Sequence, residues 1–234
     1  MQLASDCQAA AWIRDRLHPF ARDVGSIVPE GFEAYARIFH PPYRRVADGT
    51  YVPVRWQGIA AANNRSIEAE MKVLDMSSDP TEFSTAGEPL WDQQSPVGCI
   101  PHEIMQRLIS TLRRHTATAG SCMFAVWEGW GDLGVRRERA SMFALPGRNY
   151  VLLRGAIDDA LVTLSEIDRH YRSPNIWWPE DQAWCVATEI DFKWTYVGGS
   201  QPCIEQILAD PALEALPTTT AEGNAMGKGR GVQA

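Results

Sequence analysis

The sequence has no pair of cysteines in the Cys-x-x-Cys spacing that zinc sites and redox motifs use. Its five cysteines are odd in number and scattered along 234 residues: Cys7, Cys99, Cys122, Cys185 and Cys203. Disulfide frameworks and structural zinc sites both need cysteines at short, repeated spacings. The pattern therefore predicts reduced, mostly buried thiols, which are typical of cytosolic proteins.

Long apolar runs are also missing. No stretch approaches the roughly 18 consecutive apolar residues that indicate a membrane span. Residues 1–11 have neither the basic start nor the apolar run of a signal peptide. We therefore expect a cytoplasmic protein with no membrane partner.

The sequence has fewer basic residues than acidic ones, with 22 lysines and arginines against 29 aspartates and glutamates. The formal net charge is −7, and the isoelectric point is near 5.3. A nucleic-acid partner requires a basic face that neutralises phosphates. The charge balance therefore argues against binding to DNA or RNA.

The familiar catalytic motifs are absent as well. Neither of the glycine-rich loops that cradle nucleotide phosphates occurs in the sequence. His102 and Glu103 begin like the metal-binding HExxH helix, but Gln106 stands where the second histidine is needed. We expect no bound metal and no cofactor.

The apolar residues that are present follow two periods. Ile104, Met105, Leu108, Ile109 and Leu112 recur at helical spacing, which predicts a helix over residues 101–115. Further helices are predicted over residues 6–17, 56–62, 67–74 and 157–167, and after Ser200. Strands are predicted over residues 35–39, 51–54, 122–127, 141–145, 150–154 and 183–190.

This distribution is helix-rich in the first half of the chain and strand-rich in the second. It favours an α+β fold with one antiparallel or mixed sheet packed by helices. We predict a single domain over residues 1–216. Residues 217–234 offer few side chains to bury, and they are predicted to form a disordered tail.

Tryptophan is concentrated near the C-terminus, at Trp177, Trp178, Trp184 and Trp194. Such clusters line binding surfaces, but they also fill the cores of small sheets, and both interpretations remain open. Adjacent strand residues point to opposite faces, so Trp177 and Trp178 cannot both join one core. The second indole must cover another layer, a ligand or a partner, and we expect at least one of the two to be accessible to solvent.

Glu189 and Asp191 lie at the end of a stretch, residues 184–191, whose side chains alternate as in a strand. Residues two apart share one face of a strand, which places the two carboxylates roughly 6–7 Å apart. That spacing suits acid–base catalysis if the face lines a cleft. The solvent-exposed face of an edge strand would carry the same residues.

Several stretches resemble a family of uncharacterised conserved proteins from high-GC bacteria. They are residues 26–38 (SIVPEGFEAYARI), 145–150 (LPGRNY) and 173–200, which runs from SPNIWWP through VGGS. The likeness covers most of residues 8–216, and it implies no activity, cofactor or catalytic residue.

A second similarity is to the SMI1/KNR4-like (SUKH) immunity and scaffold proteins. It is carried by residues 28–32 (VPEGF), by Arg55-Trp56 and by residues 129–133 (GWGDL). In that family, these motifs begin a helix, mark a tryptophan-containing segment and form a glycine-rich hairpin. The similarity implies a non-enzymatic α+β module that binds other proteins.

Two functions follow from these observations. The first is a non-enzymatic protein-binding module, possibly SUKH-like. The alternative is a small-molecule hydrolase, with Glu189 and Asp191 as acid and base in a tryptophan-lined pocket. The two differ in one respect that a structure can test, since the hydrolase needs both carboxylates to point into a pocket beside Trp177 or Trp178.

Overall fold

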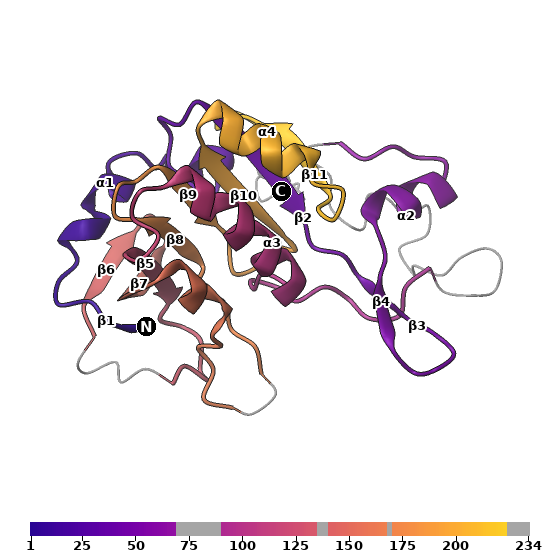
Figure 1. The fold of residues 1–234 in the computed structure, drawn as a ribbon, viewed down its shortest axis with the longest axis horizontal. Helices are drawn as coiled ribbons and strands as arrows, with labels where there is room; N and C mark the ends of the chain where they lie inside the picture. The colour runs from indigo at the N-terminus through magenta and orange to yellow at the C-terminus, as the bar shows by residue number, and fades with distance from the viewer. Residues whose placement is uncertain (69–89, 135–139, 168–169, 224–234) are drawn as a thin grey trace, which may run out of the picture.

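The structure of the protein, a computed structural model, describes residues 1–68, 90–134, 140–167 and 170–223 (Figure 1). Within these residues, nine strands join one sheet in the order β1-β7-β5-β8-β9-β10-β2-β11, and β6 pairs with β7 beside this path. Every pairing in the sheet is antiparallel. The fold is therefore α+β with a large antiparallel sheet.

The strands of this sheet are β1 (Gln2–Leu3), β2 (Ala34–Phe39), β5 (Cys122–Trp127), β6 (Met142–Leu145), β7 (Arg148–Gly155), β8 (Ile176–Pro179), β9 (Trp184–Ala187), β10 (Trp194–Gly199) and β11 (Ala215–Thr218). A separate hairpin pairs β3 (Tyr43–Arg45) with β4 (Tyr51–Pro53). Figure 1 shows this hairpin and α2 (Trp56–Ala62) to one side of the main sheet.

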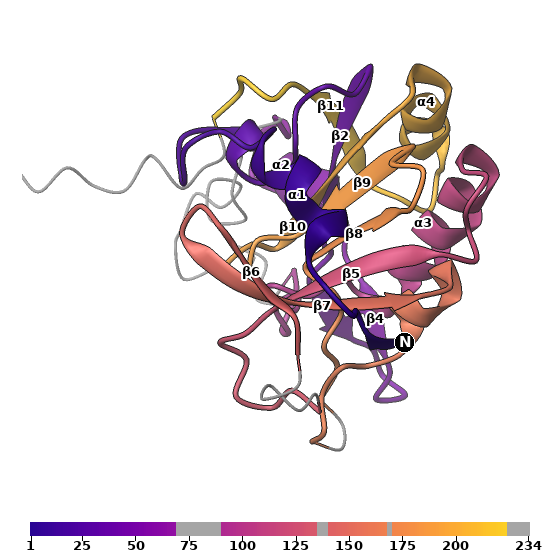
Figure 2. The same cartoon turned by 90° about the vertical axis from the view of Figure 1, so that its left-hand side faces the viewer.

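Both faces of the sheet are covered, as Figure 2 shows. One face packs against α3 (His102–Leu112) and α4 (Gln201–Ala209), whose buried side chains include Leu108 and Ile204. The opposite face packs against α1 (Ala11–Arg14), α2 and the irregular segment that contains Val24 and Ile27. The strands therefore bury alternate side chains in two separate cores, which makes the molecule a three-layer structure.

The prediction of a helix-rich N-terminal half is wrong. Before residue 100, the described residues hold two α-helices, α1 and α2, of four and seven residues. Residues 67–68 of the helix predicted over 67–74 are not helical, and residues 69–74 lie outside the described residues. The apolar side chains of Val24, Ile27 and Val28 are buried from irregular backbone with one short 3-10 turn, so burial there needs no helical period.

Three elements with many apolar residues are placed correctly. The helix predicted over residues 101–115 forms α3 and a 3-10 turn (Arg113–His115), the strand over 122–127 is β5, and Ser200 precedes α4. The helix predicted over 157–167 is reduced to a 3-10 turn (Ile157–Leu161). The strand predicted over 183–190 ends at Ala187, because the chain turns where the Phe192 amide donates to the Glu189 carbonyl.

The expected disordered tail does not begin at Pro217. Pro217 and Thr218 pair with β2 as the end of β11. Farther on, the carbonyls of Thr220 and Glu222 accept hydrogen bonds from the amides of Gly25 and Val24, both at 2.9 Å. Backbone pairing holds these residues although few of their side chains are apolar. Residues 224–234 of the predicted tail lie outside the described residues.

Among the residues that the structure describes, no helix has both the length and the apolar character that crossing a bilayer requires.

Candidate functional site

The four tryptophans of the C-terminal segment are core residues. Their side chains are between 0% and 5% exposed. Trp177 packs on the α3 side against Phe124 and Trp184, with ring centres 6.3 and 5.0 Å away. Trp178 packs on the other side of the sheet, where Trp12 meets it edge-on at 6.0 Å. The expectation of a solvent-accessible Trp177 or Trp178 is wrong, because a second layer covers the sheet.

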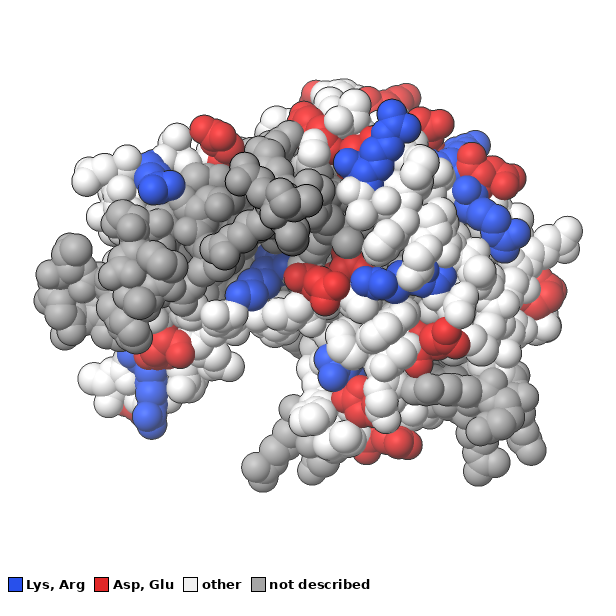
Figure 3. Space-filling view, turned by 180° about the vertical axis from the view of Figure 1, so that it is seen from behind, with Lys and Arg blue, Asp and Glu red and all other residues white. Residues whose placement is uncertain are grey.

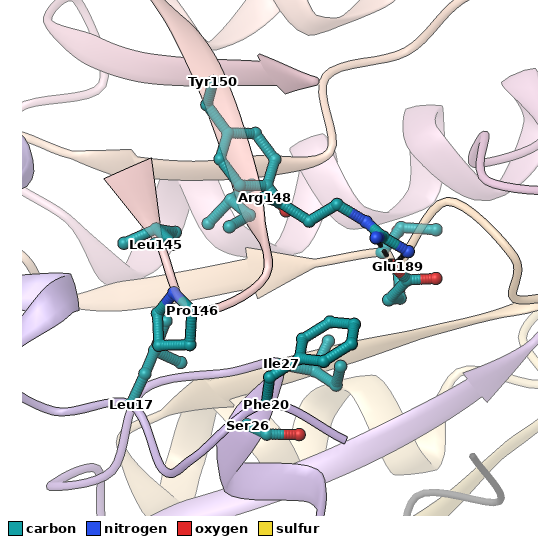
Figure 4. A pocket seen from close by; sticks show the side chains of 11 residues that line it. Leu17, Phe20, Ser26, Ile27, Leu145, Pro146, Arg148, Tyr150 and Glu189 are labelled. Carbon is teal, nitrogen blue, oxygen red and sulfur yellow. Dashed lines mark hydrogen bonds and ion pairs between the residues drawn. The ribbon is translucent and has the colours of Figure 1, made fainter. Parts of the chain in front are cut away.

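Glu189 and Asp191 lie in the turn after β9 and converge on one guanidinium group. Arg148 Nη2 is 2.8 Å from Glu189 Oε1 and 3.5 Å from Asp191 Oδ2. Figure 4 shows Arg148 extending toward Glu189 beside the ring of Phe20. The side chain of Glu189 is 4% exposed, whereas that of Asp191 is 70% exposed. The two carboxylates are therefore neighbours in very different environments.

The acceptor sites of Glu189 are already engaged. Oε1 accepts hydrogen bonds from Arg148 Nε at 3.1 Å and Nη2 at 2.8 Å, and Oε2 accepts one from the Asp191 amide at 2.7 Å. The adjoining hollow has a volume of about 20 Å³, which is room for about one water molecule. Neither Trp177 nor Trp178 lines it. Glu189 thus serves as the anchor of an arginine and has no space for a substrate beside it.

A feature that sequence reasoning missed extends from Arg148. Its guanidinium carbon lies 5.8 Å from the centre of the Trp127 ring, and the Trp127 and Trp130 rings meet edge-on at 5.3 Å. The guanidinium carbon of Arg172 lies 3.9 Å from the centre of the Trp130 ring. We call these four residues, Trp127, Trp130, Arg148 and Arg172, the arginine–tryptophan cluster. They lie at one end of the sheet, where β5 ends and β7 and β8 begin.

The two arginines are held in the same way. Just as Glu189 holds Arg148, the buried carboxylate of Asp132 accepts hydrogen bonds from Arg172 Nε at 3.0 and 3.1 Å. Burial acts to raise the pKa of Asp132, but hydrogen bonds with Arg172, Ser165 and His170 lower it below its ordinary value. Asp132 therefore stays ionised and fixes the direction of Arg172.

The two tryptophans are positioned by backbone and amide contacts. Asn175 Oδ1 accepts hydrogen bonds from the Trp127 amide at 2.9 Å and from Trp130 Nε1 at 3.3 Å. A Cβ atom on Gly129 would lie 2.1 Å from the Trp127 ring. Only glycine lets the chain pass this closely over Trp127 and return with Trp130 against its edge.

The cluster is partly open to solvent. Trp127 and Trp130 are half-buried, and the side chains of Arg148 and Arg172 are 20% and 24% exposed. A sequence signal for Trp130 existed in residues 129–133, which also carry the SUKH similarity. Nothing in the sequence links Arg148 to Glu189, 41 residues away, or Arg172 to Asp132, 40 residues away.

The cysteines are free thiols, and all except Cys7 are buried, as expected. Burial raises the pKa of Cys122 to about 12 and that of Cys203 to about 12. These thiols stay protonated and are poor nucleophiles. In the described part of the chain, no group of three or more histidine, cysteine, aspartate or glutamate residues is placed to hold a metal ion.

The helix start that the SUKH similarity implies at residues 28–32 is not formed, since this segment leads without a helix into β2. The glycine-rich residues 129–133 form turns in which Leu133 makes an isolated bridge to Ser165. Comparisons with protein-family models, curated proteins and solved structures find nothing that matches this chain.

Proposed function

We propose that this protein is a non-enzymatic module that binds another protein, and that the arginine–tryptophan cluster is its contact surface. The observation that carries the proposal is the pair of half-buried tryptophans stacked with two arginines of fixed direction. Tryptophan and arginine dominate the binding energy of protein interfaces. The SUKH similarity implies the same class of function.

Preorganisation supports the proposal. Ordering a long side chain at an interface costs about 0.5–1.5 kcal/mol, which weakens binding. Arg148 and Arg172 are already ordered by Glu189 and Asp132, and Asn175 orders both tryptophans. A partner that binds this surface therefore loses little free energy to side-chain ordering.

The electrostatic balance indicates what the partner presents. Each arginine of the cluster already has a carboxylate partner, so the surface offers no net positive charge to a polyanion. On the face seen in Figure 3, acidic and basic side chains are interspersed without a large patch of one sign. The cluster is best suited to apolar or aromatic side chains that stack on indole and guanidinium planes.

Binding also fits the chemistry better than the hydrolase alternative. Acid–base catalysis by Glu189 and Asp191 would need Glu189 to release Arg148 and the Asp191 amide. Turnover of ester or glycoside substrates that disappears in Glu189→Gln, with the fold retained, would favour the hydrolase.

Affinity capture with matched variants tests the binding function. The immobilised protein, Trp130→Ala and Tyr51→Ala are each exposed to extract from the native host, and captured proteins are identified by mass spectrometry. Tyr51 is a half-exposed aromatic residue on β4, outside the cluster. A partner held by the wild type and by Tyr51→Ala should bind Trp130→Ala at least tenfold more weakly, since central aromatic residues contribute about 2 kcal/mol or more. Equal binding to all three proteins would contradict the proposal.

A further inference from the structure

A hollow lies at the opposite end of the sheet from the arginine–tryptophan cluster. Its volume is about 280 Å³. It forms between the N-terminal segment, the start of β5, the end of β7 and the β8–β9 turn, and it is lined by Ala4, Ser5, Asp6, Ala9, Met123, Arg154, Trp178, Glu180 and Gln182. Figure 2 shows the N-terminal segment crossing this part of the sheet on its way to α1.

The floor of the hollow is apolar. Trp178 and Met123 line it and are 1% and 6% exposed, so only a small part of each side chain faces the hollow. Ala4 and Ala9 add small side chains that leave the space open. This volume lies just below the roughly 300–1,000 Å³ that is typical of ligand pockets. Such a space suits a compact body about the size of a phenyl ring with a short chain.

The rim of the hollow carries an excess of negative charge. Arg154 and Glu180 neutralise each other, with Arg154 Nη2 3.0 Å from Glu180 Oε2. Arg154 is tied down further by hydrogen bonds to Ser121 Oγ at 3.1 and 2.7 Å. Asp6 accepts hydrogen bonds from the Gln8 amide at 2.9 Å and from Ser5 Oγ at 3.4 Å. Among the described residues, no basic side chain forms an ion pair with Asp6, so one carboxylate charge is left over.

Gln182 adds a polar group at a conformational cost. It has a φ of 54°, in the left-handed region that glycine occupies without strain. A glycine would fit this tight turn better but would remove the amide that lines the hollow. Strained residues of this kind often occur at ligand sites.

From the apolar floor and the uncompensated carboxylate, we infer that this hollow binds a small organic amine in its ammonium form. The ammonium group lies against Asp6 at the rim, the apolar body packs on Trp178 and Met123, and Gln182 offers a hydrogen bond. This site is separate from the proposed protein-binding surface and does not depend on it.

Three probes of the same shape and different charge test the inference: 2-phenylethylamine, 2-phenylethanol and 3-phenylpropionate. Their binding to the full chain is measured by saturation-transfer NMR and by calorimetry at neutral pH. We expect the amine to bind about fivefold more tightly than the alcohol, which is the upper range for one partly exposed ion pair, and the carboxylate to bind most weakly.

Variants locate the site. Asp6→Asn should weaken amine binding about fivefold and remove its advantage over the alcohol. Asp15→Asn, which makes the same charge change at an exposed position that does not line the hollow, should leave both affinities unchanged. Ala9→Phe should fill the hollow and abolish binding of all three probes. The inference is overturned if the carboxylate binds as tightly as the amine, if Asp6→Asn has no effect, or if none of the probes binds the wild type.

Discussion

Arg148 and Glu189 form an ion pair that joins β7 to the turn after β9, with the carboxylate the more deeply buried partner. Replacing Arg148 by alanine leaves the charge of Glu189 buried without its cation. We expect Arg148→Ala to lower the free energy of unfolding by about 3 kcal/mol, measured by urea denaturation. Arg148→Met combined with Glu189→Leu should lose less, because no charge is stranded. A double variant that is less stable than Arg148→Ala would contradict this account.

His18 makes the stability of the protein depend on pH. Its Nδ1 is 2.8 Å from Asp23 and its Nε2 is 3.1 Å from Glu30. Hydrogen bonds with Asp23 and then Glu30 raise the pKa of His18 above 6.5, although burial acts to lower it. The folded chain holds this proton more tightly than the unfolded chain, so the stabilisation is fully present below pH 6.5 and is lost as pH rises through the raised pKa.

The test compares the unfolding free energies of His18→Gln and the wild type by urea denaturation, from below pH 6.5 to above the raised pKa of His18. The difference in unfolding free energy should be largest below pH 6.5 and should shrink at higher pH. Glu30→Gln removes one of the two carboxylates and should reduce this pH dependence without abolishing it. A difference that grows as pH rises would show that His18 is not held by its carboxylates.

The candidate site was only partly predictable at the scale of residues. The two-residue spacing of Glu189 and Asp191 does bring both carboxylates to one place, but their shared cation is Arg148, on a different strand. The contact of Arg148 with the two carboxylates depends on how the strands pair across the sheet, and no local sequence pattern predicts it. Trp127 and Trp130 lie outside the segment where tryptophan is dense, and tryptophan density does not distinguish a core from a surface.

Elements were predictable where one apolar face repeats over several turns. Helix α3 has such a pattern, and its range matches the prediction. Strand β5 is apolar on both faces, and its unbroken run of apolar residues predicts it instead. Strands β8 (Ile176–Pro179) and β10 (Trp194–Gly199) are buried on both faces and show no alternation, and proline or glycine at their ends interrupts the apolar run, so the sequence does not predict them. Strands covered on both faces lose the period of two that identifies them.

Leu108 tests the packing of α3 on the sheet. It is fully buried, as its place in the apolar arc of residues 101–115 predicts. We expect Leu108→Ala to lower the free energy of unfolding by about 2–5 kcal/mol, since the change removes buried methyl groups and leaves a cavity. Gln106→Ala, on the exposed side of the same helix, should change it by less than about 0.5 kcal/mol. Equal effects in urea denaturation would mean that α3 contributes little to the core.

In the whole molecule, the layer that covers the Trp178 face of the sheet decides whether the tryptophans are core or surface residues, which the sequence leaves open. Trp177 and Trp178 point to opposite faces, and each enters a core of its own. The layer over the Trp178 face is built largely from the first third of the chain, where α1, α2 and irregular segments carry the apolar residues. Burial there depends on contacts between distant segments, so local periodicity does not reveal it.

Residues 215–222 lie against β2 and against residues 24–25. Thr218 pairs with Tyr35 in β2, and the carbonyls of Thr220 and Glu222 accept hydrogen bonds from the amides of Gly25 and Val24.

Deleting residues 224–234 should leave the thermal midpoint within about 2 °C, because their composition offers few side chains to bury. Deleting residues 217–234 removes these backbone bonds and the end of β11, and it should lower the midpoint by about 4–8 °C, which corresponds to roughly 2 kcal/mol for a chain of this size. Differential scanning calorimetry of the two truncated proteins separates the effects. If both midpoints stay with the wild type, residues 217–223 do not hold the 24–25 segment in place; if both fall equally, the last eleven residues contribute to the fold.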